Sequence, residues 1–158
     1  MIKLVAFDVD GVLTDGSITY DENGIEYKTF NAKDGQGIVR LNNAGIVTAI
    51  ITARNNGTVT KRAQDLKITE LHQGQKHKIA KLDELLEKYN FTYDEVAYIG
   101  DDLPDVEILG KVKIAGCPND AVEEVENIAN WKSTKNGGRG AVREFCDYIL
   151  KYNNKENK

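Results

Sequence analysis

Three aspartates behind a short apolar run are the first residues of this sequence that could do chemistry. The stretch VAFDVDGVLTDG at 5–16 contains Asp8, Asp10 and Asp15. Residues i and i+2 of an extended chain point to the same side, so we expect the carboxylates of Asp8 and Asp10 to face a common point. Two carboxylates that close do not both ionise readily unless a cation joins them. The spacing predicts a cation site or an acid–base reaction, with Asp15 as a turn residue.

Other polar residues follow further apolar runs. Thr52 follows VTAII at 47–51, Asp101 follows EVAYI at 95–99 by one glycine, and Lys78 begins a long amphipathic segment. A third carboxylate, from Asp101, would complete a hard-oxygen site of the kind that Mg²⁺ prefers. A hydroxyl from Thr52 and an ammonium from Lys78 are suited to phosphate oxygens. A nucleophile, a neighbouring acid, a metal and a cation together favour phosphoryl transfer.

The elements that must position these residues alternate along the chain. Short runs rich in β-branched residues predict buried strands at 3–7, 47–51, 95–99 and 112–115. Helical periodicity predicts a helix that ends at Gly45 and others within 78–89 and 140–150. This alternation is typical of an α/β fold with a parallel sheet and helices on both faces. In such a sheet ligands bind beyond the carboxyl ends of the strands, where the polar residues above are expected.

One segment interrupts the alternation. The stretch SITYDENGIEYKTF at 17–30 has two β-prone runs around Asn23-Gly24 and predicts a β-hairpin. No linker or low-complexity tract divides the chain. We therefore expect a single domain over residues 1–152, with the hairpin 17–30 inserted into it, and a polar tail over residues 153–158.

Composition excludes several classes of protein. The 158 residues carry 21 basic and 25 acidic side chains, a net charge of −4 that gives no support to nucleic-acid binding. Cys117 and Cys146 lack metal-ligand spacing and are expected to be reduced. No apolar run approaches the length of a membrane span or a signal-peptide core. The sequence predicts a cytoplasmic protein with neither a membrane nor a nucleic acid as a partner.

Four ordered motifs resemble those of the haloacid dehalogenase superfamily of aspartate-nucleophile phosphatases. They are DVDGVLTDG, IITAR, QGQKHK and GDDLPD. The resemblance covers nearly the whole chain and implies a Rossmann-like fold. Two more stretches, FNAKDGQGI and NGGRGAVREFCD, are similar to members that act on phosphorylated sugar acids. The resemblance thus implies Mg²⁺-dependent hydrolysis of the phosphate monoester of an eight-carbon sugar acid.

The resemblance also implies roles for individual residues. Asp8 would be the nucleophile that forms an aspartyl-phosphate, and Asp10 would protonate the leaving alkoxide and then activate water. Thr52 and Lys78 would hold the transferring phosphoryl oxygens. Asp8 and Asp101 would bind the metal through their carboxylates, and Asp10 through its backbone carbonyl.

Substrate recognition is expected from several parts of the chain. The resemblance implies substrate contacts by Asn31, Asp34, Gly35, Arg54, Arg62 and Arg139, in addition to Asp10 and Lys78. Relatives acting on nine-carbon sugar acids tend to carry glutamates at the positions of Arg54 and Arg139, so two arginines favour the eight-carbon substrate. An alternative interpretation is that Asn31, Asp34 and Gly35 form only the hairpin exit and the start of a helix.

The hairpin also leads to an expectation about assembly. The residues between Asp10 and Thr52 suffice for the hairpin and one helix, which leaves no room for a separate cap domain. An exposed two-stranded ribbon is marginal alone, and packing it against other copies would cover its edges and the active site. With the resemblance, this predicts a homotetramer. The alternatives are a nine-carbon sugar-acid phosphatase, a non-catalytic oligomerisation or regulatory domain, and a sugar-phosphate mutase.

Overall fold

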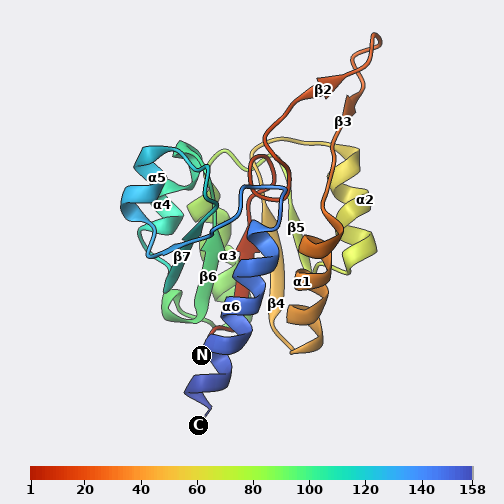
Figure 1. Cartoon of the computed structure of the whole chain (residues 1–158). Coiled ribbons are helices and arrows are strands. Elements are labelled where there is room, and N and C mark those ends of the chain that lie inside the picture. Colours follow the sequence, from red (N-terminus) through yellow and green to blue (C-terminus); the bar gives the residue numbers. More distant parts are fainter. Residues whose placement is uncertain (158) are drawn as a thin grey trace.

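The computed structural model describes residues 1–157, and its centre is a six-stranded parallel sheet (Figure 1). The strands are β1 (Leu4–Phe7), β4 (Val47–Ile51), β5 (Glu70–His72), β6 (Val96–Ile99), β7 (Ile114–Cys117) and β8 (Trp131–Lys132). Their order in the sheet is β5-β4-β1-β6-β7-β8. Strand β1 therefore lies between β4 and β6, with Leu4 paired to both Val47 and Val96. This register brings the carboxyl ends of three central strands side by side.

Helices cover both faces of the sheet. One face carries α1 (Ala32–Asn43), α2 (Gly57–Leu66) and α6 (Ala141–Glu156), and the other carries α3 (Lys78–Tyr89), α4 (Val106–Leu109) and α5 (Glu123–Ile128). Two short 3-10 turns, η1 (Tyr93–Glu95) and η2 (Leu103–Asp105), flank β6. Successive side chains of β1 point to opposite faces of the sheet. Val5 and Phe7 therefore pack in the hydrophobic core on one face, and Leu4 and Ala6 pack in the core on the other. The predicted α/β fold is confirmed.

The predicted hairpin is present and projects from the body of the molecule (Figure 1). It consists of β2 (Thr19–Tyr20) and β3 (Glu26–Tyr27), paired antiparallel. The Oδ1 atom of Asp21 accepts the backbone N–H groups of Asn23 and Ile25 and closes the turn. Four large apolar side chains on this ribbon are between 55 and 58 % exposed, namely Ile18, Tyr20, Ile25 and Tyr27. A single copy of the chain therefore leaves an apolar surface on the hairpin in contact with solvent.

The carboxyl-terminal stretch differs from the prediction. Helix α6 continues to Glu156, so residues 153–156 are helical rather than a polar tail. Asn153 accepts the N–H of Ile2 and donates to its carbonyl, both at 2.7 Å. The amino group of Met1 pairs with Glu156. Contacts with the N-terminal residues thus extend α6 beyond the part of the sequence that has apolar helical periodicity.

None of the helices in residues 1–157 combines the length and the apolar character that crossing a bilayer requires.

Candidate active site

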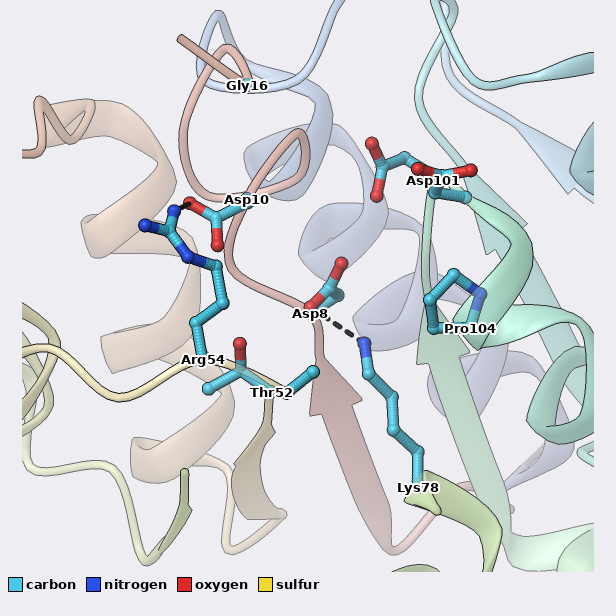
Figure 2. Close-up of a pocket in the computed structure, with 10 residues that line it drawn as sticks. Asp8, Asp10, Gly16, Thr52, Arg54, Lys78, Asp101 and Pro104 are labelled. Atoms are coloured by element: carbon cyan, nitrogen blue, oxygen red, sulfur yellow. Dashed lines mark hydrogen bonds and ion pairs between the residues drawn. The ribbon is translucent and has the colours of Figure 1, made fainter. Parts of the chain in front are cut away.

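A buried lysine joins two carboxylates where the central strands end, and Figure 2 shows its contact with one of them, Asp8. Lys78 is the first residue of α3 and is only 4 % exposed. Its Nζ lies 2.9 Å from Oδ1 of Asp8, just after β1, and 2.8 Å from Oδ1 of Asp105. Burial alone lowers the pKa of the Lys78 ammonium, but the two carboxylates outweigh it and hold the pKa above its ordinary value. Lys78 therefore stays charged and fixes the orientation of the Asp8 carboxylate.

Asp105 holds this arrangement in place through hydrogen bonds to both of its carboxylate oxygens. Its Oδ1 accepts from Lys78 and from the hydroxyl of fully buried Tyr98, and its Oδ2 accepts the backbone N–H groups of Asp101 and Asp102 at 3.0 and 3.2 Å. Sequence reasoning left the roles of Asp102 and Asp105 open, although both belong to the GDDLPD motif. The structure shows Asp105 holding the turn that carries Asp101.

Three carboxylates form a compact acidic cluster. Asp8, Asp101 and Asp105 place oxygen atoms within 4.8 Å of one another. A Cβ atom at Gly11 would lie 1.9 Å from Oδ2 of Asp101, so this carboxylate packs against the backbone that follows Asp10. Burial first, and neighbouring carboxylates second, raise the pKa of Asp8 to about 6 and that of Asp101 to about 8.

The cluster has the donors that a divalent cation needs. The Oδ1 atom of Asp101 is buried and has no hydrogen-bond partner among residues 1–157. Both oxygens of Asp105 already accept two hydrogen bonds each, which leaves Asp8 and Asp101 as the available ligands. Two carboxylates in this environment fit Mg²⁺, which binds to a few carboxylates and keeps waters or phosphate oxygens as its other ligands. The backbone carbonyl of Asp10 stays a predicted third ligand.

Mg²⁺ is expected to stabilise the folded chain more at pH 8 than at pH 5.5. Because the pKa values of Asp8 and Asp101 are raised to about 6 and about 8, the folded chain binds more protons than the unfolded chain between about pH 4 and pH 8. Without metal, stability therefore falls as pH rises through that window, and bound Mg²⁺ removes the repulsion responsible. Differential scanning fluorimetry with Mg²⁺ or with EDTA should give a Tm shift of about 5 °C or more at pH 8.

The shift should be smaller at pH 5.5, where protons already neutralise the cluster, and the variant Asp101→Asn should lose most of it at both pH values. Equal shifts at the two pH values in the unmodified chain would contradict this account of the cluster.

Asp10 turns away from the cluster, toward the base of the hairpin. Its Oδ1 lies 2.5 Å from Nζ of Lys28 and 3.7 Å from Nη1 of Arg54. Glu26 joins the same network, with Oε1 at 3.1 Å from Lys28 and Oε2 at 2.7 Å from Nη2 of Arg54. Sequence reasoning identified Asp10 and Arg54 but missed Lys28 and Glu26. Their contacts to Asp10 and Arg54 span 18 and 28 residues of sequence, so no local pattern indicated them.

Ten residues, Asp10 and Arg54 among them, surround a cavity of about 270 Å³ (Figure 2). Its lining consists of Asp8, Asp10, Gly16, Thr52, Ala53, Arg54, Lys78, Asp101, Asp102 and Pro104. Thr52 is 3 % exposed, and its backbone is fixed by hydrogen bonds to the carbonyl of His72 and from the N–H of Gln75. The structure therefore brings together all the residues predicted to act as nucleophile, acid, metal ligands and phosphate donors.

Three predicted substrate-binding residues lie outside that cavity, near the start of α1. The side chain of Asn31 accepts the N–H groups of Lys33 and Asp34 and so caps α1. Arg62 donates to the carbonyl of Asn31 at 3.2 Å. A Cβ atom at Gly35 would lie 2.5 Å from Nη2 of Arg62, which explains the small residue there. In one copy of the chain, Asn31, Gly35 and Arg62 form a separate group.

Asp34 and Arg139 also lie outside the cavity. Asp34 is 1 % exposed, and its Oδ1 accepts the N–H of Arg143 at 2.9 Å in the first turn of α6. Burial raises the pKa of Asp34 above its ordinary value in spite of that hydrogen bond. Arg139 is exposed, with Nη2 at 3.6 Å from Oδ2 of Asp15. Asp34 thus caps the N-terminus of α6, and Arg139 lies beside the loop that follows Asp10.

The glycine-rich segment that carries Arg139 packs against this same loop. The N–H of Gly138 donates to the carbonyl of Val12 at 3.0 Å. A Cβ atom at Gly137 would lie 1.8 Å from the carbonyl oxygen of Gly11, so only glycine fits. The backbone of this segment therefore supports the loop between Asp10 and the hairpin.

Comparison with known proteins assigns the family. The profile of the haloacid dehalogenase-like hydrolases matches residues 66–146. The chain is 44 % identical over 149 residues to the 3-deoxy-D-manno-octulosonate 8-phosphate phosphatase KdsC of Escherichia coli K12, covering 94 % of this chain and 79 % of that protein. This chain is a haloacid dehalogenase-like hydrolase. KdsC of Salmonella typhimurium is 43 % identical over the same shares of the two chains.

Solved structures of haloacid dehalogenase-like phosphatases superpose closely on this hydrolase. A probable YrbI family phosphatase from Pseudomonas syringae matches with a TM-score of 0.94 and 46 % identity, covering 95 % of this chain and 85 % of that one. The 3-deoxy-D-manno-octulosonate 8-phosphate phosphatase of Moraxella catarrhalis, in complex with magnesium, phosphate and KDO, matches with a TM-score of 0.93 and 42 % identity, covering 95 % and 86 %. The predicted superfamily is confirmed.

Proposed function

We propose that this chain hydrolyses 3-deoxy-D-manno-octulosonate 8-phosphate to the free sugar acid and inorganic phosphate. The observation that carries the proposal is the cavity in which Asp8, Lys78 and Arg54 converge, in a chain 44 % identical to phosphatases of that substrate. We place the reaction in the cytoplasmic synthesis of lipopolysaccharide precursors. The free, buried thiols of Cys117 and Cys146 fit a reducing compartment.

The geometry supports an aspartyl-phosphate mechanism. An oxygen of Asp8 attacks phosphorus, the ester P–O bond breaks, and Asp10 gives its proton to the departing alkoxide. Asp10 then takes a proton from water, which attacks the aspartyl-phosphate and returns Asp8 and free phosphate. Lys78 and Thr52 bind the transferring phosphoryl oxygens throughout. Asp8 and Asp101 would hold Mg²⁺, which would supply positive charge to neutralise those oxygens.

Arg54 has a free donor for the other end of the substrate. Its Nη2 is bound to Glu26, but its Nη1 is buried without a hydrogen-bond acceptor among the described residues. Oδ1 of Asp10 lies 3.7 Å from this nitrogen, too far for a hydrogen bond. A buried guanidinium nitrogen without a hydrogen-bond acceptor is costly, so a ligand that supplies one gains affinity there. The carboxylate of a sugar acid is such an acceptor, and pairs with a guanidinium favourably.

Steady-state phosphate release with Mg²⁺ tests this proposal. We expect kcat/KM for 3-deoxy-D-manno-octulosonate 8-phosphate to exceed that for a nine-carbon sialic-acid-like 9-phosphate by at least about tenfold, the usual scale of discrimination by pocket contacts. A preference for the nine-carbon compound would assign the second substrate instead. No release from either compound would favour a non-catalytic domain.

We also propose that the chain assembles as a homotetramer through its hairpin. The exposed apolar side chains at Ile18, Tyr20, Ile25 and Tyr27 are the surface that would be buried. Assembly would further explain why several predicted substrate-binding residues lie away from the cavity of their own chain, because a neighbouring copy can present them to it. It would also exclude water from an open site.

Replacing Ile25 with aspartate is expected to dissociate the assembly and lower kcat/KM by about tenfold or more, because a buried charge at an interface is costly. Ile25→Val keeps the apolar contact and should behave as the unmodified chain. Light scattering combined with the phosphate-release assay checks both variants. A tetrameric Ile25→Asp protein, or an unmodified chain that is monomeric at assay concentration, would contradict hairpin-mediated assembly.

A further inference from the structure

The base of the hairpin buries charged side chains, although apolar side chains are exposed along the same ribbon. The side chain of Lys28 is 2 % exposed and that of Glu26 is 10 % exposed. Lysine and glutamate are rarely buried unless they are paired. An ion pair on an exposed ribbon gains little, so fixing the hairpin alone does not account for two desolvated charges at its base. Their partners on the body of the protein indicate another role.

Lys28 contacts the residue proposed as the general acid. Its Nζ lies 2.5 Å from Oδ1 of Asp10 and 3.1 Å from Oε1 of Glu26. A charge-assisted contact to Oδ1 fixes the rotation of the Asp10 carboxylate and leaves its Oδ2 for the reacting proton. Proton transfer depends on such placement, because the donor must lie within hydrogen-bond reach of the leaving oxygen.

Glu26 holds the residue proposed to bind the substrate carboxylate. Its Oε2 accepts from Nη2 of Arg54 at 2.7 Å and from Nδ2 of Asn56 at 3.1 Å. Because Nη2 is occupied, Nη1, which makes no hydrogen bond among the described residues, is left as the donor available in the cavity. Glu26 also limits the ion pair between Arg54 and Asp10, because without this acceptor the guanidinium would be free to shorten its 3.7 Å distance to the Asp10 carboxylate.

We infer that Lys28 and Glu26 are positioning residues through which the hairpin sets the active site. Lys28 orients Asp10 for proton transfer to the leaving alkoxide, and Glu26 directs Arg54 toward the carboxylate of the substrate. This inference rests on the proposed function. It assigns different roles to two residues joined by one ion pair. Substrates that differ in leaving group and in the presence of a carboxylate can therefore distinguish the two roles.

The test compares the sugar-acid phosphate with p-nitrophenyl phosphate. The latter releases a stable phenolate that needs no protonation, and it has no carboxylate. Lys28→Met should lower kcat/KM for the sugar-acid phosphate by about 10- to 100-fold, a part of what a general acid contributes, and that for p-nitrophenyl phosphate by less than about threefold. Lys28→Arg keeps the charge and should recover most of the loss.

Glu26→Gln should act differently. It is expected to raise KM for the sugar-acid phosphate by about tenfold, with kcat within about twofold, and to leave p-nitrophenyl phosphate hydrolysis unchanged. Matched controls are Glu22→Gln, at the exposed hairpin tip, and Lys151→Met, on the exposed face of α6. Both should match the unmodified chain, and light scattering should show the same assembly for every variant compared.

Equal losses on the two substrates would overturn the inference, since they would indicate that the ion pair only anchors the hairpin. Unchanged kinetics in both variants would overturn it as well. If Lys28→Met does not fold, Lys28→Gln and the Glu26→Gln arm decide the question by the same comparison. An unmodified chain that does not hydrolyse the sugar-acid phosphate would instead refute the proposed function.

Discussion

Replacing Asp8 with asparagine is expected to abolish phosphate release while the chain still folds and becomes more resistant to heat. The amide cannot form the aspartyl-phosphate, so activity should fall by at least about 10⁴-fold. Burial and Asp105 raise the pKa of Asp8 to about 6, which means that its charge is unfavourable in the folded chain at neutral pH. Removing this charge while keeping the shape of the side chain should therefore raise the Tm of the metal-free protein.

Phosphate release and thermal melting in EDTA at pH 7.5 check both parts of this prediction. Asp94→Asn, at an exposed site in η1, is the matched control and should change neither activity nor Tm appreciably. Retained phosphatase activity in Asp8→Asn would remove the covalent mechanism. A large fall in Tm would show instead that the ion pair between Asp8 and Lys78 stabilises the fold more than the repulsion among the carboxylates destabilises it.

Four of the six strands of the central sheet could be predicted because buried parallel strands are continuous apolar runs. The run at 47–51 is strand β4, and the run at 95–99 contains β6, Val96–Ile99. The run at 112–115 is offset from β7, Ile114–Cys117, because pairing with β6 rather than hydropathy decides where that strand lies. The two-residue strand Trp131–Lys132 has no periodicity of its own and exists only through its pairing with β7.

The candidate site was predictable where its residues follow strands. Asp8 and Asp101 are placed by their sequence neighbours, and the sheet then brings them together. Lys28 and Glu26 were not identified as functional and the role of Asp105 was left open, because a charged residue acquires its role from partners distant in sequence. Their contacts at 18, 28 and 27 residues of separation, to Asp10, Arg54 and Lys78, leave no local pattern.

Helix-capping residues show the same limit of sequence-based prediction for substrate-binding residues. Asn31 and Asp34 were predicted to contact substrate, with a helix start as the alternative. In the structure the side chain of Asn31 caps α1 and that of Asp34 accepts the N–H of Arg143 in α6. Asparagine and aspartate have the same chemistry in a cap as in a binding site. Sequence alone cannot separate the two roles, and the binding role of these residues stays a prediction.

Replacing Lys78 with methionine is expected to have the largest combined effect on stability and activity. The side chain is 4 % exposed and carries the positive charge between Asp8 and Asp105. Breaking a buried ion pair by removing one partner typically costs about 3–5 kcal/mol, because the other charge is left buried and unpaired. Losing a donor to the transferring phosphoryl oxygens should lower kcat by at least about 10²–10³-fold. Urea unfolding in EDTA and phosphate release with Mg²⁺ measure the two effects.

The stability loss should depend on pH, which distinguishes electrostatics from packing. The pKa of Asp8 already lies at about 6 and would rise further without the ammonium, and the pKa of Asp101 lies at about 8. Both groups bind protons near pH 5, so Lys78→Met should be destabilised less at pH 5 than at pH 8. Lys81→Met, on the same helix, should show little loss at either pH.

Lys78→Arg separates the charge from its placement. A guanidinium preserves the positive charge and should recover part of the stability at pH 8, but its planar fork cannot reproduce the single-point contacts of Nζ at 2.9 and 2.8 Å. Activity should therefore stay low even where stability returns. If the methionine variant loses as much stability relative to the unmodified chain at pH 5 as at pH 8, the buried carboxylates do not depend on Lys78 for charge compensation, and its role is confined to binding phosphate.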